Sequence, residues 1–325
     1  MRPSDGIGEH GPHDSDEPFA PNGFIVLDKP PGPTSYDCIR FLRRTCRIPS
    51  DIKIGHLGTL DPFACGVILI ALGKAVKFAE FALHRKKAYR ARVYLGEETD
   101  TLDPTGKVIS AASIPPDWSS RLDEIKARFT GEIEQMPPVF SAKQVDGKRS
   151  YKAARKGESI ELKPSKVTVY SLEILSFDEN LFDFTCEVSG GTYVRSLARD
   201  MAKELGTVGH LVGLERTAVG EFDSDLSIPF SAFEVGGRHV LLHHLRPPDQ
   251  LLGHLPSCTV GPESEHKIPH GQKLSRDDIE KDWPDEKNAP EIIRLNDRNG
   301  KFLSLGKINP SGKPLLIIPF KRVDD

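Results

Sequence analysis

The tetrapeptide Thr-Leu-Asp-Pro occurs twice in this chain and places an aspartate in the same local sequence at Asp61 and at Asp103. An ionised carboxylate can act as a nucleophile or stabilise developing positive charge, so each aspartate is a candidate catalytic group. Taken alone, an Asp-Pro pair is an ordinary turn. The two sites therefore have to be distinguished by their flanking residues.

Asp103 lies among polar residues and precedes Pro-Thr-Gly-Lys, where an aspartate bonds to its own backbone in a turn. We expect water to reach it freely. Asp61 is followed by FACGVILIAL, an apolar run that predicts a buried strand. A carboxylate at the mouth of such a strand loses hydration and stays ionised only beside a cation or hydrogen-bond donors. Asp61 is therefore the candidate reactive carboxylate.

Other chemistries lack their sequence patterns. The five cysteines are scattered without a CxxC pair, which predicts free thiols in place of a zinc site or disulfide framework. The acidic loop around Asp103 lacks the ligand spacing and closing glutamate of an EF-hand. Neither GxGxxG nor GxxxxGK[ST] occurs, which argues against dinucleotide and P-loop sites. The sequence therefore gives no sign of a zinc, calcium, dinucleotide or P-loop site.

The composition fits a two-domain protein. The chain has 325 residues and a net charge of −3, yet basic residues gather at 41–47, 84–92 and 147–157. Any one of these runs could be an ordinary solvated face, but together they suit contacts with phosphates. No apolar run has the length of a membrane span and the N-terminus lacks the apolar stretch of a signal peptide, so we expect a cytoplasmic protein without a membrane partner.

The elements that position these residues alternate irregularly. Strand patterns cover 23–28, 52–56, 66–73, 87–96, 166–177, 181–191 and 208–222, and helical spacing covers 74–83, 119–129 and 192–206. Thr34 or Ser35 is expected to cap a helix that follows, and Ser119 or Ser120 another. A basic helix is expected near 149–156 and a hairpin turn around Asp103. This order predicts an α+β fold with a mixed, largely antiparallel sheet flanked by helices.

Three regions are expected along the chain. Residues 1–21 are polar and read as a disordered tail. Residues 22–238 carry the candidate catalytic groups. Residues 250–325 contain three apolar runs separated by turns at Asn299-Gly300 and Ser311-Gly312, which predicts a small β-barrel domain.

Six segments together resemble the bacterial-type tRNA pseudouridine-55 synthases, which modify a uridine in the T-loop of tRNA. In chain order they are FIVLDKPPGPTS, GHLGTLDPFACGVILIALGKAVKF, KKAYRARVYLGEETDTLDPTG, MPPVFSAKQVDGKRSYKAARKG, SGGTYVRSLARDMAKELG and LERTAVGEF. They span roughly residues 23–222 in the order of the family, which is far more specific than any one motif. The resemblance implies a pseudouridine-synthase-like fold with a PUA-like C-terminal domain, although the match of that last domain is weak.

The resemblance also implies roles. Asp61 takes the position of the catalytic aspartate, and Arg195 would pair with it and keep it ionised. Tyr89 would stack on the flipped-out base, and Tyr193 would face the same pocket. Taken alone, Arg195 could be a surface arginine and each tyrosine a core aromatic. The reaction involves no redox step, so the family implies no cofactor or metal.

Further residues would contact the RNA. His56 resembles the histidine that wedges into the RNA loop, Lys29 would support the active-site loop and Leu214 would form an apolar wall of the uracil pocket. An insert near 136–160 would grip the T-arm of tRNA through phosphates, with basic residues Lys148, Arg149, Lys152, Arg155 and Lys156. Each of these, met singly, could be a solvated or a packed residue. The family suggests a monomer without an obligatory protein partner.

Two positions depart from the family pattern. SAKQVDG carries its lysine one place earlier than SAxKxxG, and Glu215 stands where a basic residue is frequent. Two rival functions remain beside pseudouridine synthesis. One is a tRNA-folding chaperone in which catalysis is secondary. The other is a carboxylate-dependent glycosidase, which needs a second acid near Asp61 that the sequence does not identify.

Overall fold

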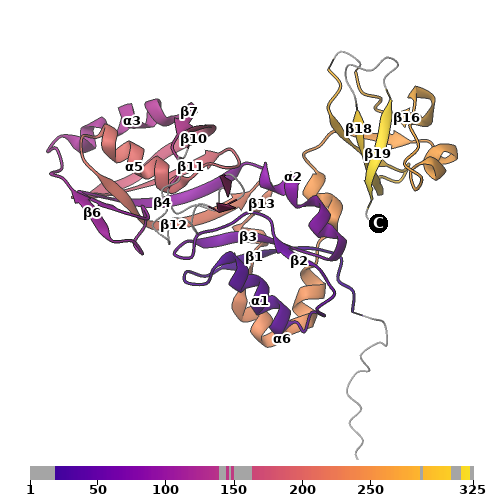
Figure 1. Cartoon of the computed structure of the whole chain (residues 1–325), viewed down its shortest axis with the longest axis horizontal. Helices are drawn as coiled ribbons and strands as arrows, with labels where there is room; N and C mark the ends of the chain where they lie inside the picture. The colour runs from indigo at the N-terminus through magenta and orange to yellow at the C-terminus, as the bar shows by residue number, and fades with distance from the viewer. Residues whose placement is uncertain are drawn as a thin grey trace, which may run out of the picture.

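This computed structural model describes residues 19–138, 144–145, 148–149, 163–285, 288–308 and 316–322. The chain contains a large mixed sheet and, near the C-terminus, a smaller second sheet (Figure 1). Among the described residues, no helix combines the length and apolar character that crossing a bilayer requires.

The large sheet has ten strands, and its main path runs in the order β14-β1-β3-β12-β4-β11-β10-β7, with β2 added to β3 and β13 added to β12. Its strands are β1 (Gly23–Lys29), β2 (Ile54–His56), β3 (Cys65–Leu72), β4 (Lys87–Leu95), β7 (Gly131–Gln135), β10 (Ser165–Asp178), β11 (Leu181–Val188), β12 (Gly209–Val219), β13 (Phe222–Asp223) and β14 (Ile228–Pro229). Most neighbours are antiparallel, and β1–β14 and β3–β12 are parallel. The predicted α+β class with a mixed, largely antiparallel sheet is confirmed.

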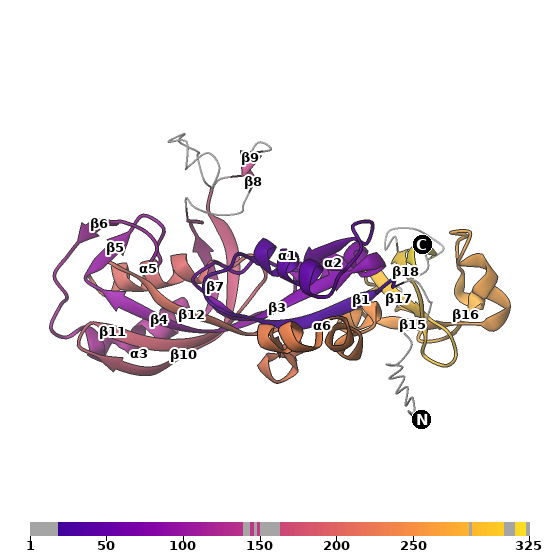
Figure 2. The ribbon, with the colours of Figure 1, turned by 90° about the horizontal axis from the view of Figure 1, so that it is seen from below.

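Helices cover the two halves of this sheet separately. They are α1 (Ser35–Thr45), η1 (Gly73–Phe78), α2 (Ala79–Leu83), η2 (Trp118–Arg121), α3 (Leu122–Phe129), α5 (Val194–Glu204), η3 (Ser224–Leu226) and α6 (Phe230–His244). Figures 1 and 2 show α3 and α5 on the half built from β4, β10 and β11, and α1 and α6 on the half built from β1 and β3. Two hairpins, β5 (Glu97–Thr99) with β6 (Val108–Ala111) and β8 (Gln144–Val145) with β9 (Lys148–Arg149), stand apart from the sheet.

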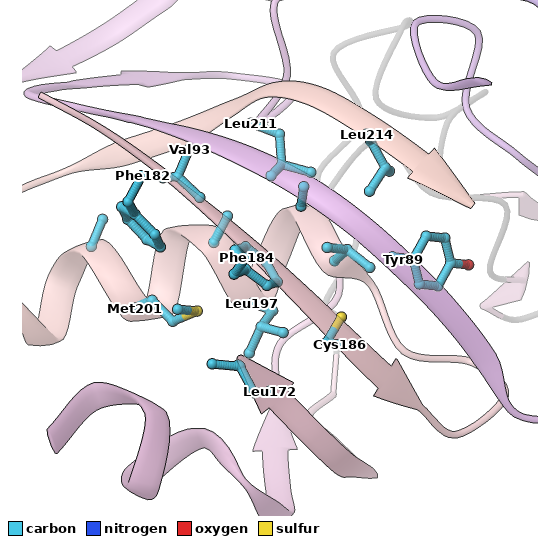
Figure 3. Close-up of a cluster of buried hydrophobic side chains, with 14 of the residues drawn as sticks. Tyr89, Val93, Leu172, Phe182, Phe184, Cys186, Leu197, Met201, Leu211 and Leu214 are labelled. Carbon is cyan, nitrogen blue, oxygen red and sulfur yellow. The ribbon is translucent and has the colours of Figure 1, made fainter. Parts of the chain in front are cut away.

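Each half has its own apolar core. In one, Leu197 and Met201 of α5 pack on Phe182 and Phe184 of β11 (Figure 3). In the other, α1 and α6 bury the face of β1 and β3 that carries Leu27. A further cluster unites Val26 of β1 and Val67 of β3 with Val219 of β12, so the two halves also pack together at the seam between β3 and β12.

That seam is unusually tight. Only two residue pairs join β3 to β12, Cys65 with Glu215 and Gly66 with Arg216. A Cβ added at Gly66 would lie 2.3 Å from the carbonyl oxygen of Arg216, and Gly66 has a φ of 97°. Only glycine meets both conditions without strain. Because the sheet divides here, the loop that enters β3 is left open to receive side chains from β4 and α5.

Most helix and strand predictions agree with the structure. Thr34 caps α1 with a complete capping box, and Gly206 follows α5 with a φ of 85°. The predicted cap of the 119–129 helix is wrong: Arg121 occupies the N-cap of α3 without a side-chain hydrogen bond, because a 3-10 turn, η2, precedes α3. The sequence patterns did not predict α6, whose helix is broken at Gly237 (φ 47°).

The second sheet is a curled half-barrel in the order β16-β15-β17-β18-β19. Its elements are η4 (Pro248–Leu252), β15 (Ser257–Val260), η5 (Pro262–Lys267), η6 (Arg276–Asp278), β16 (Ile279–Lys281), β17 (Ile292–Asn296), β18 (Phe302–Ile308) and β19 (Ile317–Arg322). The three predicted apolar runs correspond to its last three strands. Phe302 packs edge-on against Phe78 of η1, with ring centroids 5.9 Å apart, so the half-barrel docks on the β1–β3 half.

The predicted domain limits stay predictions. Residues 1–18 of the predicted tail lie outside the described residues, and Phe19 packs against the core of the β1–β3 half. The expected limit at residue 238 falls inside α6. Of the expected basic helix near 149–156, residue 149 belongs to β9 and the others lie outside the described residues.

The close packing at Gly66 predicts that its replacement by alanine destabilises the protein more than the same replacement at Gly131. Gly131, at the start of β7, has a φ of 105° and nothing within 4 Å of an added Cβ. We expect Gly131→Ala to cost about 1–3 kcal/mol of unfolding free energy through backbone strain. Gly66→Ala adds overlap with the Arg216 carbonyl and should cost about 2 kcal/mol more. Urea unfolding of both variants checks this, and equal losses would show that the seam can relax.

Candidate active site

The loop that carries Asp61 connects β2 to β3 and is anchored to the start of α1. The Ser35 hydroxyl accepts a hydrogen bond from the Leu60 N–H (2.9 Å) and donates one to the Leu60 carbonyl (3.0 Å). The Ala64 N–H donates to the carbonyl of Asp61 itself (3.2 Å). The backbone on both sides of the aspartate is therefore held, and its side chain has few orientations available.

Lys29 supports the same loop from beneath. It is fully buried, and its ammonium group donates to the carbonyls of Pro30 (2.9 Å), Pro62 (3.1 Å) and Ala64 (2.6 Å). Burial lowers the pKa of this lysine. Its three N–H donors are all directed at backbone, so this geometry suits support of the loop and leaves no donor for a direct RNA contact.

Arg195 forms a two-point ion pair with Asp61. Its Nε lies 2.8 Å from Oδ2, and its Nη2 donates to Oδ1 over 3.1 Å. The arginine side chain is 5% exposed and that of Asp61 is 29% exposed. A guanidinium fork matched to a carboxylate fixes the direction of both groups as well as the charge. The structure thus brings together the two residues that the resemblance paired.

The expectation for Asp103 is wrong in one respect. Its carboxylate makes the expected turn contacts, accepting from the Thr105 N–H (3.0 Å) and the Thr101 hydroxyl (2.7 Å). Its side chain, however, is 7% exposed, and its Oδ2 lies 3.5 Å from Nη1 of Arg195. Water is excluded because the turn between β5 and β6 folds back over the N-terminus of α5, where the Thr101 carbonyl also accepts from Arg195 (2.8 Å).

The two aspartates in equivalent sequences therefore share one arginine. Sequence reasoning found no second acid near Asp61, and Asp103 is that acid. It does not have the arrangement of a glycosidase pair, which needs two carboxyl groups on opposite sides of a sugar bond. Asp103 Oδ1 is already occupied by the Thr101 and Thr105 hydrogen bonds. The geometry makes Asp103 a support for Arg195.

The pKa of the Asp61 carboxyl lies above its ordinary value, because burial outweighs the opposing effect of the neighbouring cations. Burial raises the pKa of its carboxyl, the negative charge of Asp103 raises it further, and Arg195 lowers it. Arg216 lowers it as well. The two guanidinium groups are what favours the ionised form in a site that otherwise disfavours charge.

The first turn of α5 is held by the end of β7. The Gln135 side-chain oxygen accepts from the Tyr193 N–H (2.8 Å), and the Met136 carbonyl accepts from the Ser196 hydroxyl (2.8 Å). These contacts satisfy donors at the start of the helix that carries Arg195. Sequence analysis did not identify Gln135, whose only signal is a polar residue at the end of a strand.

Tyr89 and Leu214 lie at one end of the core shown in Figure 3. Both are buried members of that cluster, and the Tyr89 hydroxyl is directed away from the other labelled side chains. Burial raises the pKa of Tyr89, Arg216, which lies opposite it in β12, lowers it, and the charge of Asp61 raises it. Tyr89 is therefore a core residue whose hydroxyl is also affected by the charge of Asp61.

The remaining candidate residues lie on other elements or outside the described residues. Tyr193 is the half-buried N-cap residue of α5, two residues before Arg195. His56 ends β2 opposite Ile70, at the entrance to the Asp61 loop. Lys148 and Arg149 form β9, and nothing is described of their side chains. Arg155, with Lys152, Lys156 and the shifted lysine of SAKQVDG, lies outside the described residues.

Comparison with known proteins identifies the family of this chain. Residues 43–194 match the N-terminal domain of the TruB family pseudouridylate synthases. A protein of Caldanaerobacter subterraneus subsp. tengcongensis called tRNA pseudouridine synthase B is 38% identical over 288 residues, which cover 88% of this chain and 94% of that protein. A protein of the same name from Rhodospirillum rubrum is 39% identical, over 88% of this chain and 92% of the relative. This chain belongs to the TruB family of pseudouridylate synthases.

Solved structures support the fold of this TruB family member. A Cbf5-Nop10-Gar1 complex contains a chain with a TM-score of 0.71 and 24% identity, covering 97% of this chain and 92% of that one. A chain of an H/ACA ribonucleoprotein bound to substrate RNA has a TM-score of 0.68 and 22% identity, covering 93% and 84%. These similarities extend over both sheets, so the half-barrel belongs to the shared architecture.

The shared arginine predicts a titration effect. Replacing Asp103 by asparagine removes the negative charge that raises the pKa of Asp61, so we expect the Asp61 pKa to fall. Carbon-13 NMR titration of the Asp61 carboxyl group measures it. Asp100→Asn makes the same charge change in the same turn and should leave the Asp61 pKa unchanged. A rise in the pKa, or equal effects of the two substitutions, would contradict the shared ion pair.

Proposed function

We propose that this chain isomerises a uridine of tRNA to pseudouridine at position 55 of the T-loop, with Asp61 as the catalytic carboxylate. The observation that carries this proposal is the Asp61 carboxylate, gripped at two points by the buried guanidinium of Arg195. Membership of the TruB family and the shared name of the relatives support the reaction and the tRNA substrate.

The chemistry requires a carboxylate of this kind. The bond between C1′ of the ribose and N1 of uracil breaks, the base turns, and a new bond forms between C1′ and C5. The proton on C5 is lost and N1 regains one, so substrate and product have the same composition. An ionised Asp61 can bond to the sugar or stabilise the positive charge that develops there as the base departs.

The other site residues take roles around this carboxylate. Arg195 keeps Asp61 ionised and directed, and Asp103 holds the arginine from its other side. Tyr89 offers an aromatic ring for the everted base, which loses its stacking when it leaves the RNA. Leu214 lines the apolar side of the pocket next to Tyr89, Tyr193 contributes from the start of α5, and His56 enters the RNA loop.

The basic insert then holds the T-arm. Lys148 and Arg149 form β9, which pairs with β8 in a hairpin that projects from the sheet (Figure 2), and this suits contacts with phosphates on either side of the target nucleotide. Lys152, Arg155 and Lys156 extend the same basic segment. We propose that the protein works as a cytoplasmic monomer and that the half-barrel near the C-terminus contacts a further part of the tRNA.

Asp61→Asn tests the reaction. The amide keeps the shape of the side chain but cannot act as a nucleophile, so we expect the rate of pseudouridine formation to fall at least about 1,000-fold. Release of tritium from C5-labelled uridine in T-arm RNA measures this rate, and filter binding should show retained RNA affinity. Asp100→Asn is the matched control and should keep the wild-type rate. Wild-type turnover by Asp61→Asn would exclude the assigned role.

The same variant separates catalysis from tRNA folding. A chaperone that binds the T-arm would need no ionised carboxylate, so Asp61→Asn would retain its full effect on the folding of a misfolded tRNA. We expect that any such effect persists while pseudouridine formation is lost. A wild-type protein that promotes folding but forms no pseudouridine would favour the chaperone function.

The insert predicts a change in salt dependence. Phosphate contacts release counterions, so removing one lowers the slope of log affinity against log salt by about 0.7 to 0.9. We expect Lys148→Ala combined with Arg149→Ala to weaken binding to T-arm RNA and to reduce the slope by about 1.5. Lys126→Ala on α3, whose ammonium pairs with Glu173, serves as the control and should leave the slope unchanged. An unchanged slope in the double variant would remove this hairpin from the interface.

A further inference from the structure

Arg216 occupies the central position of the large sheet. It lies in β12 opposite Gly66 of β3 on one side and opposite Tyr89 of β4 on the other. Its side chain is 1% exposed, and it is the largest of the fully buried side chains. Directly opposed residues on one face of a sheet have neighbouring side chains, so Arg216 adjoins both the Asp61 loop and the Tyr89 ring.

The guanidinium group bonds to backbone on both sides of Asp61. Its Nη1 donates to the Thr59 carbonyl (3.2 Å) and its Nη2 to the Gly58 carbonyl (3.3 Å), just before the aspartate. Its Nε donates to the Val67 carbonyl (2.7 Å), after the aspartate. One side chain thus fixes the two ends of the loop relative to each other.

The charge of Arg216 is not used in a salt bridge. Among the residues that the structure describes, no carboxylate forms an ion pair with it, and its partners there are carbonyl oxygens. The nearby Lys87 is also a buried cation, and burial, Arg216 and Arg85 lower the pKa of Lys87 to about 8. A buried, unpaired cation is costly. Neutral hydrogen-bond donors would be enough to support a loop, so loop support alone does not explain why a charged arginine occupies this position.

That explanation lies in the two groups that Arg216 faces. The arginine favours the ionised carboxylate of Asp61, and it is paired with Tyr89 across β12 and β4, where it lowers the pKa of the Tyr89 hydroxyl. We propose that Arg216 is a positioning residue, which joins the Asp61 loop to Tyr89 and fixes the stacking ring relative to the carboxylate. The inference rests on the proposed function, since the relation matters only when Tyr89 holds the base on which Asp61 acts.

Arginine is required for this task because its donors point in several directions from one rigid plane. A lysine keeps the charge but places it on one flexible atom, which cannot hold Gly58, Val67 and Tyr89 together. Misplacement of a reacting group by about 1 Å can cost about 100-fold in rate. We therefore expect Arg216→Lys to slow pseudouridine formation by about 100-fold and to leave the affinity for T-arm RNA unchanged.

The experiment is a double-substitution cycle under single-turnover conditions. Wild type, Arg216→Lys, Tyr89→Phe and the double variant are compared by tritium release from T-arm RNA, with binding and thermal midpoint measured for each. Tyr89→Phe keeps the ring and removes the hydroxyl that faces Arg216, so we expect it to slow the reaction as well. The double variant should be no slower than Arg216→Lys, because both substitutions break the same connection.

Arg85→Lys is the matched control. Arg85 is also a buried arginine that donates to backbone carbonyls, those of Gln250 (3.2 Å) and Leu251 (2.7 Å), but it supports η4. We expect Arg85→Lys to lower the thermal midpoint and to retain the rate. An equal loss of rate in Arg85→Lys would mean that any buried arginine matters alike, and it would overturn the inference.

The other possible results also support or overturn the proposed role of Arg216. Wild-type rate in a folded Arg216→Lys, a loss confined to RNA affinity, or rate losses of the two single variants that simply multiply would each overturn the role. If Arg216→Lys does not fold, Tyr89→Phe decides: a slower reaction at unchanged affinity supports the connection, and an unchanged rate refutes it. Failure of the proposed function is distinct, because the wild-type protein would then form no pseudouridine.

Discussion

One guanidinium group shared by two carboxylates is the interaction on which this site depends. Arg195 presents one edge to Asp61 and its remaining nitrogen to Asp103 and the Thr101 carbonyl. Two negative charges in a mostly buried site would otherwise force one of them to take up a proton. The arginine therefore opposes protonation of Asp61 and fixes the direction of its carboxylate.

The surroundings of that pair are arranged to keep the aspartate loop still. Lys29 and Arg216 are buried cations whose donors bond to carbonyls on both sides of Asp61. Buried carbonyls need partners, and a cation that supplies several donors satisfies them while adding positive potential. Lys29 and Arg216 thus add to the positive potential that Arg195 supplies at Asp61.

The division of the sheet makes this arrangement possible. Only two residue pairs are in ladder register between β3 and β12, and the loop before β3 lies where β4 and α5 bring Tyr89 and Arg195. Gln135 and Met136 hold the first turn of α5 at the point where β7 leads into the basic insert. The segment expected to grip RNA is thus connected to the helix that carries the arginine through hydrogen bonds between side chains and backbone.

The sequence by itself determined most of the strands and helices and the α+β class, because strand and helix periodicity are local properties. The order of its motifs, through the family resemblance, singled out Asp61, Arg195 and Tyr89 as candidates. Three features required the tertiary structure: the burial of Asp103, the bridge made by Arg216 and the helix α6. Asp103 lies in a polar turn, so its sequence predicts a hydrated side chain. It is buried only because that turn folds over α5. Whether a polar residue is buried depends on residues distant in the sequence that pack over it, and a local sequence pattern does not show which residues these are.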